Sequence, residues 1–548
     1  MLQNPILKGF YPDPSICRVG NDFYMVTSSF SYFPGVPVFH SKDLMHWEQI
    51  GHVLDRKEQL HVTYEDISLG IFAPTIRYNN GIFYMITTNM TTHENFFCTA
   101  TDPAGSWSEP IVIRDATGID PSLFFDDDGK VYFTGTSGFG DKRFDHQVIA
   151  CCEIDLTTGQ LVGEQWELGD GAAKAAISPE APHLYKKDGW YYLIIAEGGT
   201  EHYHAVTVSR SKSLHEPFEN FHSNPILTHR HLGKDYPICN VGHGDLVELP
   251  DGSWYMVCLA TRLIDGYHKL LGRETFIAPV VWEEDWPVVS CGTGKLEWTY
   301  PAPNLAPCPF PTPPAHDDFK NGSLNYEWNY LGTPYENFVS VRPGKISIQM
   351  LKKNTVPWEF EGEVFDFFGH MMRTGKTHAN MPWIGKRLTE ASFMVSTKVS
   401  VILRNKEAAG IAILQNNANQ LRIEIAATDH ENQVRVSAYK VVYSLYDGKM
   451  HYEETCEGSV FVDAADAYIL AITGHNNKYD FMVQPQNDCN DTTSADAQQI
   501  SVAEHIDGTH LGTESAGGFV GAYAGLYATS NGEFTDNHAD FAYYEMLV

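Results

Sequence analysis

The stretch Asp13–Val26, which reads DPSICRVGNDFYMV, decides the fold of this 548-residue chain. A short apolar run leads into a polar turn, and a second apolar run then opens with an aromatic residue and a tyrosine. Gly and Asn in the turn tolerate positive φ, so the pattern predicts a β-hairpin. The same pattern returns in four later stretches: Ala73–Ile86, Asp120–Phe133, Ala181–Ile194 and His243–Val257.

The repeats are regularly spaced along the first 300 residues. Their second strands carry a tyrosine at intervals of 48 to 63 residues, at Tyr24, Tyr84, Tyr132, Tyr192 and Tyr255. A period of about 40–50 residues is enough for one four-stranded propeller blade. We therefore predict a five-bladed β-propeller over residues 1–300.

The chain changes character after the last repeat. Residues 301–314 contain seven prolines, which favours a stiff linker, placed at 301–316, over central strands. Alternating runs such as Leu421–Ile425 and Gln433–Val436 then indicate half-buried antiparallel strands. We predict that residues 317–548 form a β-sandwich of the concanavalin or jelly-roll type, so the fold class is all-β.

Composition restricts the possible partners. Hydrophobic residues make up 43% of the chain, and 38 basic against 69 acidic residues leave a net charge of −31. That charge repels nucleic acid and anionic membranes, whereas an aromatic content of 13% suits neutral sugars. The sequence shows no apolar span of ~18 residues, no secretory signal pattern and no CxxC motif. We expect reduced, buried thiols and a cytoplasmic location.

Three acids occupy matched positions in the repeats. The first residue of each repeat, or the residue next to it, is in order Asp13, Ala73, Asp120, Glu180 and His243. First strands of propeller blades line the central channel, so these side chains should converge on one axis. Glycoside hydrolysis needs two carboxyl groups that flank the scissile bond, and a third can raise the pKa of the proton donor. The matched acids therefore predict a glycosidase.

Three motifs support that prediction by resemblance. YPDPS at Tyr11–Ser15, GIDPSLF at Gly118–Phe124 and SPEAPH at Ser178–His183 resemble the three signature blocks of glycoside hydrolase family 43. Glu197–Glu201 and Leu271–Phe276 match as well. The resemblance implies a five-bladed propeller enzyme that acts on xylosides and arabinosides with inversion. It is strongest to the β-xylosidases that carry a C-terminal sandwich.

The resemblance also implies roles for the acids. Asp13 would be the general base, Glu180 the general acid, and Asp120 the residue that orients Glu180 and raises its pKa. An inverting mechanism implies that the base and the acid lie about 6.5–9.5 Å apart, which leaves room for a water molecule. Arg273 would bind hydroxyls of the terminal sugar, with a structural ion pair as the alternative.

Further residues are expected at the sugar. Phe30 and Phe72 would form apolar walls, unless they are simply core, and Thr200 would contact the substrate. Phe519, in the loop Gly517–Ala522, would reach from the sandwich and cap the site, which favours release of single sugars from chain ends. The alternative is that Phe519 belongs to the sandwich core.

No cofactor is required for this chemistry. The resemblance implies a possible structural Ca²⁺ near the propeller axis, held through water beside His243. The pairs His202/His204 and His229/His231 lack an evident third ligand, so we interpret them as structural.

The leading hypothesis is an exo-acting, inverting glycosidase that releases D-xylose from the non-reducing ends of β-1,4-xylo-oligosaccharides. An α-L-arabinofuranosidase or dual-activity enzyme is the nearest alternative, and a non-catalytic glycan-binding propeller is the alternative from another class. Xylo- or arabino-oligosaccharides are the expected partners, without nucleic acid or membrane. Relatives are often dimers or tetramers, so a homo-oligomer is possible.

Overall fold

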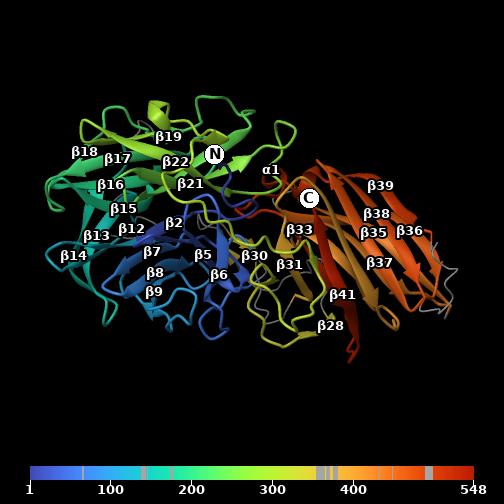
Figure 1. Ribbon diagram of the computed structural model, residues 1–548. Helices are drawn as coiled ribbons and strands as arrows, with labels where there is room; N and C mark the ends of the chain where they lie inside the picture. The colour runs from blue at the N-terminus through green and yellow to red at the C-terminus, as the bar shows by residue number, and fades with distance from the viewer. Residues whose placement is uncertain are drawn as a thin grey trace. The chain divides into compact units, whose positions relative to one another are not determined.

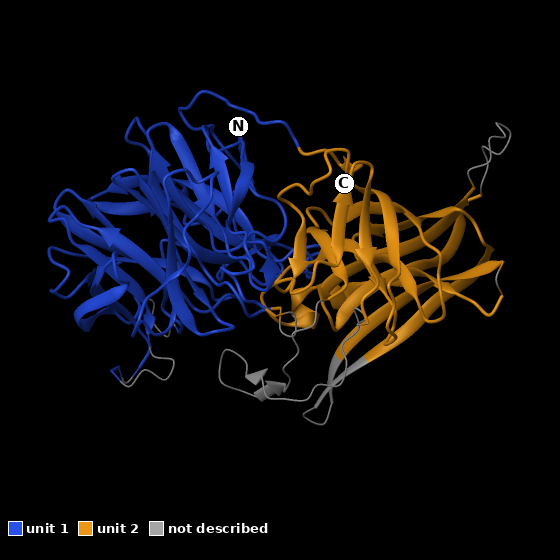
Figure 2. Ribbon diagram, turned by 90° about the horizontal axis from the view of Figure 1, so that it is seen from below, with its two compact units in different colours: residues 1–62, 68–312 blue, residues 63–67, 313–548 orange. Residues whose placement is uncertain are grey.

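The computed structural model describes residues 1–63, 67–137, 143–144, 146–172, 177–352, 364–365, 371–373, 381–430, 432–446, 449–487 and 498–548. The chain divides into two compact units (Figure 2). Unit 1 comprises Met1–Val62 and Ser68–Thr312, and unit 2 comprises Thr63–Ile67 and Pro313–Val548. The division falls inside the proline-rich stretch that is predicted to be a linker.

Unit 1 is built from antiparallel sheets that form the blades of a propeller (Figure 1). Blade 1 consists of β2 (Ser15–Val19), β3 (Asp22–Val26), β5 (Gly35–Ser41) and β6 (Glu48–Leu54). Blade 2 consists of β7 (Thr75–Asn79), β8 (Ile82–Asn89), β9 (Glu94–Ala100) and β10 (Ile111–Val112). Blade 3 consists of β11 (Ile119–Phe125), β12 (Val131–Ser137), β13 (Val148–Asp155) and β14 (Gln160–Gly169).

The remaining two blades complete the propeller. Blade 4 consists of β15 (Glu180–Lys187), β16 (Trp190–Glu197), β17 (Ala205–Ser211), β18 (Glu219–Asn220) and β19 (Leu227–Thr228). Blade 5 consists of β20 (Ile238–Glu248), β21 (Trp254–Arg262), β22 (Glu274–Glu283) and β23 (Trp286–Val289). Near the ends of unit 1, β1 (Leu2–Gln3) pairs with β24 (Thr299–Tyr300). Within the described residues the blades number five, which confirms the predicted propeller.

The first strands of the blades form a closed ring. Contacts run from β2 to β7, β7 to β11, β11 to β15, β15 to β20, and back from β20 to β2. In every blade the first two strands pair as an antiparallel hairpin, such as Ser15 with Val26 in blade 1. The second strand therefore returns to the end at which the first strand begins. The loop between the second and third strands lies at that same end.

A buried ion pair ties the ring together. Arg77 Nη1 of β7 donates to Asp245 Oδ2 of β20 at 2.9 Å, and Asp245 also accepts from Ser15 Oγ at 2.6 Å and from the Ile16 amide at 3.0 Å. The Tyr185 hydroxyl of β15 donates to the same carboxylate. Burial acts to raise the pKa of Asp245, but Arg77 and the hydrogen bonds outweigh it, so the pKa is lowered. A buried carboxylate is stable only when it is paired in this way.

Unit 2 is a β-sandwich, as predicted. One sheet has the order β27 (Val339–Arg342), β28 (Lys345–Gln349), β41 (His538–Leu547), β32 (Ser392–Ser400), β37 (Ala467–His475), β38 (Lys478–Gln486) and β39 (Ile500–Asp507), with β25 (His316–Asp317) on β41. The other contains β36 (Lys449–Asp463), β35 (Gln433–Tyr446), β34 (Asn419–Ala427), β33 (Ala408–Asn416), β40 (Tyr523–Thr529), β31 (Trp383–Arg387) and β26 (Asn329–Leu331). Contacts of β32 and β37 with β33, and of β28 with β40, hold the sheets face to face.

Few other elements occur in the described residues. They are the short strands β4 (Tyr32–Phe33), β29 (Val364–Phe365) and β30 (Met371–Arg373), the 3₁₀ turns η1 (Ser290–Gly292) and η2 (Thr509–Leu511), and the helix α1 (Thr513–Ala516). None of the helices in this part of the chain is long and apolar enough to span a bilayer. Most of the described cysteines are buried; Cys291 and Cys456 are exposed and Cys308 is part-exposed.

Candidate active site

The three predicted acids lie at the beginnings of three first strands. Asp13 stands just before β2, Asp120 is the second residue of β11, and Glu180 is the first residue of β15. Because these strands belong to one contact ring and run in equivalent directions, the acids lie at the same end of the propeller. We call this end the acid end. Asp13 and Asp120 are buried, whereas Glu180 is part-exposed.

The backbone at these positions is strained. Positive φ angles occur at Asp13 (55°), Asp120 (53°), Ala181 (50°) and His243 (52°), which are the equivalent positions of four repeats. The strand register also shifts next to these residues in blades 3, 4 and 5. Each non-glycine residue in this region costs roughly 1–3 kcal/mol, and such strain concentrates at functional sites. The surrounding fold therefore imposes the conformation that presents these side chains.

Asp13 is held as a carboxylate. Arg273 Nη1 donates to Asp13 Oδ1 at 2.8 Å, Ser28 Oγ donates to Oδ2 at 2.5 Å, and His243 Nδ1 lies 3.7 Å from Oδ1. Burial acts to raise the pKa of Asp13, but the charges of Arg273 and His243 and the Ser28 hydrogen bond outweigh it, so the pKa is lowered. A buried, ionised carboxylate of this kind can accept a proton from water.

Asp120 and Glu180 are shifted in the opposite direction. Burial, and next the charge of Asp13, raise the pKa of Asp120 to about 8, although the Ala181 amide donates to its carboxylate. Burial, followed by the charges of Asp120 and Asp13, raises the pKa of Glu180 well above its ordinary value. Glu180 therefore holds its proton to a higher pH than an ordinary glutamate does. The three carboxyl groups interact electrostatically, and the pKa of Asp13 is lowered whereas those of Asp120 and Glu180 are raised.

Arg273 contacts the catalytic cluster itself. It stands immediately before β22, and its guanidinium carbon lies 5.5 Å from the centre of the Phe30 ring. The alternative interpretation of Arg273 was a structural ion pair. Arg273 does form an ion pair, and its partner is Asp13. The predicted contact with sugar hydroxyls stays a prediction.

Ser28 is a functional candidate that the sequence analysis did not single out. It is fully buried in the loop between β3 and β5, at the acid end of blade 1. The position of the Ser28-Ser29-Phe30 segment could have indicated a functional loop, because the equivalent loops of blades 4 and 5 carry the site candidates Thr200 and Arg273. Nothing local in the sequence states which of the two serines faces Asp13.

The two phenylalanines pack together beside the cluster. The Phe30 and Phe72 rings have centroids 5.2 Å apart, and the Phe10 ring lies 5.6 Å from Phe30. Both side chains are buried, with exposed fractions of 2% for Phe30 and 7% for Phe72. They form one aromatic cluster, and its role as a sugar wall stays a prediction.

Thr200 and Phe519 lie in different units. Thr200 is part-exposed in the loop between β16 and β17, at the acid end of blade 4. Phe519 is part-exposed in unit 2 and follows the exposed residues Gly517 and Gly518, so it is not a fully buried core residue of the sandwich. Their contacts with substrate stay predictions.

The surroundings of His243 do not fit a directly bound Ca²⁺ ion. Ca²⁺ takes six to eight oxygen ligands. The nearby carboxylates of Asp13 and Asp245 are already paired with Arg273 and Arg77. Direct coordination by these side chains therefore does not fit, and the cation held through water stays a prediction. No step of the chemistry described below uses it.

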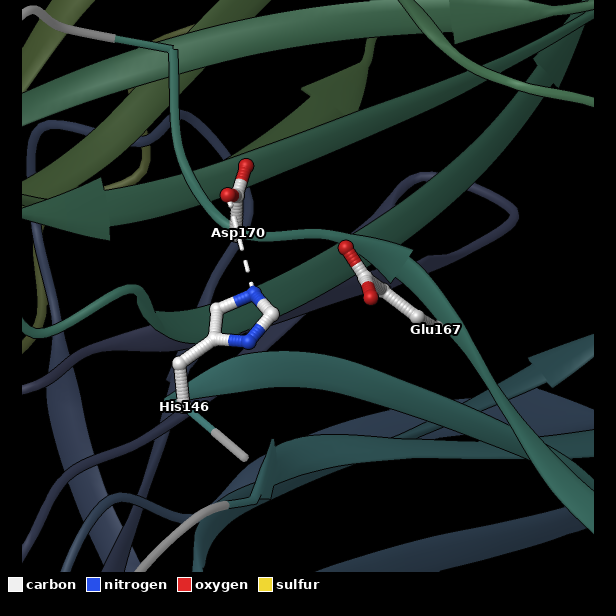
Figure 3. Close-up of side chains that lie close together, drawn as sticks. All are labelled: His146, Glu167 and Asp170. Carbon is white, nitrogen blue, oxygen red and sulfur yellow. Dashed lines mark ion pairs between the residues drawn. The ribbon is translucent and has the colours of Figure 1, made fainter. Parts of the chain in front are cut away.

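A different group of side chains has the spacing of a metal site. His146, Glu167 and Asp170 lie on the outer part of blade 3 with ligand atoms within 4.8 Å of one another (Figure 3). All three are exposed, and His146 Nε2 lies 3.7 Å from Asp170 Oδ2. Exposed groups of this kind are common without a metal, and the group does not include His243.

Comparison with known proteins covers both units. The family model described as "Glycosyl hydrolases family 43" matches residues 2–287. The model described as "Beta xylosidase C-terminal Concanavalin A-like domain" matches residues 316–546. Together these matches span nearly the whole chain.

Individual relatives match over nearly their full length. The chain is 43% identical to a "Xylosidase/arabinosidase" of Butyrivibrio fibrisolvens, over 99% of this chain and 98% of the relative. It is 35% identical to a "Non-reducing end alpha-L-arabinofuranosidase" of Bacteroides ovatus, over 99% and 94%. Among solved structures, a xylan beta-1,4-xylosidase from Bacillus halodurans superimposes with a TM-score of 0.84 at 31% identity, and all of both chains is covered.

Proposed function

Because the chain belongs to glycosyl hydrolases family 43, we propose that it is an exo-acting, inverting glycosidase that releases D-xylose from the non-reducing ends of β-1,4-xylo-oligosaccharides. The protein is a glycoside hydrolase. One observation carries the proposal: within a single cluster, the pKa of Asp13 is lowered while that of Glu180 is raised. This division between a base and an acid is what hydrolysis of a glycosidic bond needs.

The mechanism follows from the two protonation states. Asp13 accepts a proton from a water molecule, whose oxygen forms the new bond to the anomeric carbon as the bond to the leaving oxygen breaks. Glu180 gives its proton to that leaving oxygen. Since water attacks the face opposite the leaving group, the anomeric configuration inverts. Asp120 acts as a positioning residue, because its charge raises the pKa of Glu180.

Arabinofuranoside hydrolysis is the second candidate activity. The name of the Butyrivibrio relative covers both activities, and the Bacteroides relative is named an arabinofuranosidase. The Bacillus halodurans structure is titled a xylosidase. The names of these relatives therefore support both activities.

Two measurements test the proposal. Rates on the 4-nitrophenyl β-D-xyloside and α-L-arabinofuranoside should favour the xyloside, and a tenfold preference for the arabinofuranoside would reverse the choice. Proton NMR of the first-formed sugar should show inversion.

The acid and base assignments have their own tests. Glu180→Gln should lose about 10²–10⁴-fold in kcat on oligosaccharides but less on substrates with good leaving groups, because only proton donation is removed. Asp13→Ala should be inactive on every substrate. Unchanged turnover of oligosaccharides by Glu180→Gln would eliminate the acid assignment.

A further inference from the structure

Three large hydrophobic side chains of unit 1 are notably exposed to solvent. Apart from Met1, the most exposed in its described residues are Ile177 (67%), Tyr203 (64%) and Tyr267 (63%). Exposed aromatic groups that gather in one region commonly mark a binding surface. Their position relative to the acids decides which ligand they suit.

The strand directions place all three at the acid end. Ile177 precedes the first strand of blade 4, Tyr203 lies in the loop between β16 and β17, and Tyr267 lies in the loop between β21 and β22. Both kinds of connection lie where the first strand begins. We call these three residues the blade 4–5 rim.

Polar contacts join the segments of the rim to one another. The Gly198 amide donates to the Ile177 carbonyl at 2.7 Å, which links the two segments of blade 4. Lys269 of the Tyr267 loop forms an ion pair with Glu201 of the Tyr203 loop. The three segments that carry the rim residues are therefore joined to one another across two blades.

A second chain of contacts leads from the rim to the acid cluster. Asn240 Nδ2 donates to Glu201 Oε2 at 3.2 Å, and His204 Nδ1 lies 3.1 Å from the Asn240 carbonyl oxygen. His204 is buried, and its electrostatic interaction reaches Asp13. The loop that carries Tyr203 is thus linked to the cluster through Glu201, Asn240 and His204.

The chemistry of the acid decides which part of the substrate meets the rim. A general acid protonates the leaving oxygen, so the leaving group departs on the side of Glu180. Ile177 precedes Glu180 by three residues, and Tyr203 is on the other acid-end loop of the same blade. The base, Asp13, is on blade 1. The leaving part of the substrate therefore extends over the acid end of blade 4, which the Lys269–Glu201 ion pair joins to blade 5.

We propose that Tyr203 and Tyr267, with Ile177 beside them, bind the leaving-group xylose units of the substrate. The tyrosine rings offer apolar faces and a polar edge, which suit a neutral sugar ring with its C–H face and hydroxyls. Burial, with Lys234 and Lys269 nearby, lowers the pKa of His202, which disfavours a positive charge next to Tyr203. This inference rests on the proposed function and adds the residues that hold the remainder of the chain.

Substrates that differ only in their leaving group test the proposal. The double variant Tyr203→Ala/Tyr267→Ala is compared with the unchanged enzyme on xylobiose, xylotriose, xylotetraose and β-D-xylosyl fluoride. We expect kcat/KM on xylotetraose to fall about threefold for each ring and about tenfold for the double variant. The fluoride lacks a sugar in its leaving group, so its rate should stay within about twofold.

Two matched variants serve as controls. Tyr78→Ala removes an exposed tyrosine at the far end of the first strand of blade 2 and should leave all rates unchanged. Tyr203→Phe keeps the ring and should retain most of the oligosaccharide rate.

Other outcomes overturn the inference in distinct ways. Equal losses on the fluoride and on xylotetraose, or no loss on either, would remove the rim from substrate binding while the proposed function stands. A changed oligomeric state by sedimentation with unchanged oligosaccharide rates would assign the rim to a protein interface. Absence of xylosyl fluoride hydrolysis by the unchanged enzyme would instead refute the proposed function.

Discussion

Replacing Ser28 by alanine removes one of the two hydrogen bonds that hold the carboxylate of Asp13. The Ser28 hydroxyl donates to Oδ2 at 2.5 Å, and Arg273 continues to donate to Oδ1 at 2.8 Å. The substitution removes a single oxygen atom from a fully buried site and leaves the Asp13–Arg273 ion pair in place. It therefore changes the basicity of Asp13 more than its position.

The size of the effect follows from the hydrogen bond. A hydrogen bond to a charged group contributes about 1.5–3 kcal/mol, and each pKa unit corresponds to about 1.4 kcal/mol. Because the bond lowers the pKa of Asp13, its loss should raise that pKa by about 1–2 units. The low-pH limb of kcat/KM reports protonation of the base in the free enzyme. That limb should move to higher pH by the same amount.

The assay is kcat/KM on 4-nitrophenyl β-D-xyloside between pH 3 and 9, with the chromophore read after quenching in base. Ser29→Ala is the matched control, because Ser29 Oγ accepts from the Val36 amide at 3.1 Å in the same loop and is not bonded to Asp13 in the described contacts. Its low-pH limb should not move. A uniform loss of rate in Ser28→Ala with an unmoved low-pH limb would refute the reasoning.

Two further predictions concern the other buried carboxylates. Asp120→Asn removes a charge that raises the pKa of Glu180, so the high-pH limb of kcat/KM should move to lower pH. An unmoved limb would show that Asp120 does not act through Glu180. Arg77→Met leaves the carboxylate of Asp245 buried without its cation, which should reduce the free energy of unfolding by about 3–5 kcal/mol in urea titrations at pH 7. Arg18→Met is the control, because Arg18 donates to the exposed backbone carbonyl of Gly20. It should reduce the free energy of unfolding by less than about 1 kcal/mol. Equal losses in the two arginine variants would contradict the role of the buried pair.

Local chemistry was enough to predict the blades. Each hairpin depends on alternating apolar residues and on a turn of Gly, Asn or Asp, and both are properties of a few consecutive residues. The repeat then placed Asp13, Asp120 and Glu180 at equivalent positions without any coordinates. Resemblance of the surrounding motifs to a known family supplied their roles.

The rim was not predictable in the same way. Tyr203 and Tyr267 stand in loops whose sequences match no repeat, and exposure of a side chain depends on everything that packs around it. Only the fold shows that the loops of blades 4 and 5 meet through Glu201 and Lys269.

The sequence by itself determined the hairpins, their fivefold repetition and the matched acids, because hydrophobic alternation and turn preference act over a few residues. Only the tertiary structure decided in which direction the pKa of each acid is shifted, because these shifts depend on groups that are distant along the chain. Arg273 reaches Asp13 across 260 positions when the last blade closes the ring beside the first. Closure of the ring gives Asp13, Asp120 and Glu180 different burial and different neighbouring charges, so acids at equivalent repeat positions differ in pKa.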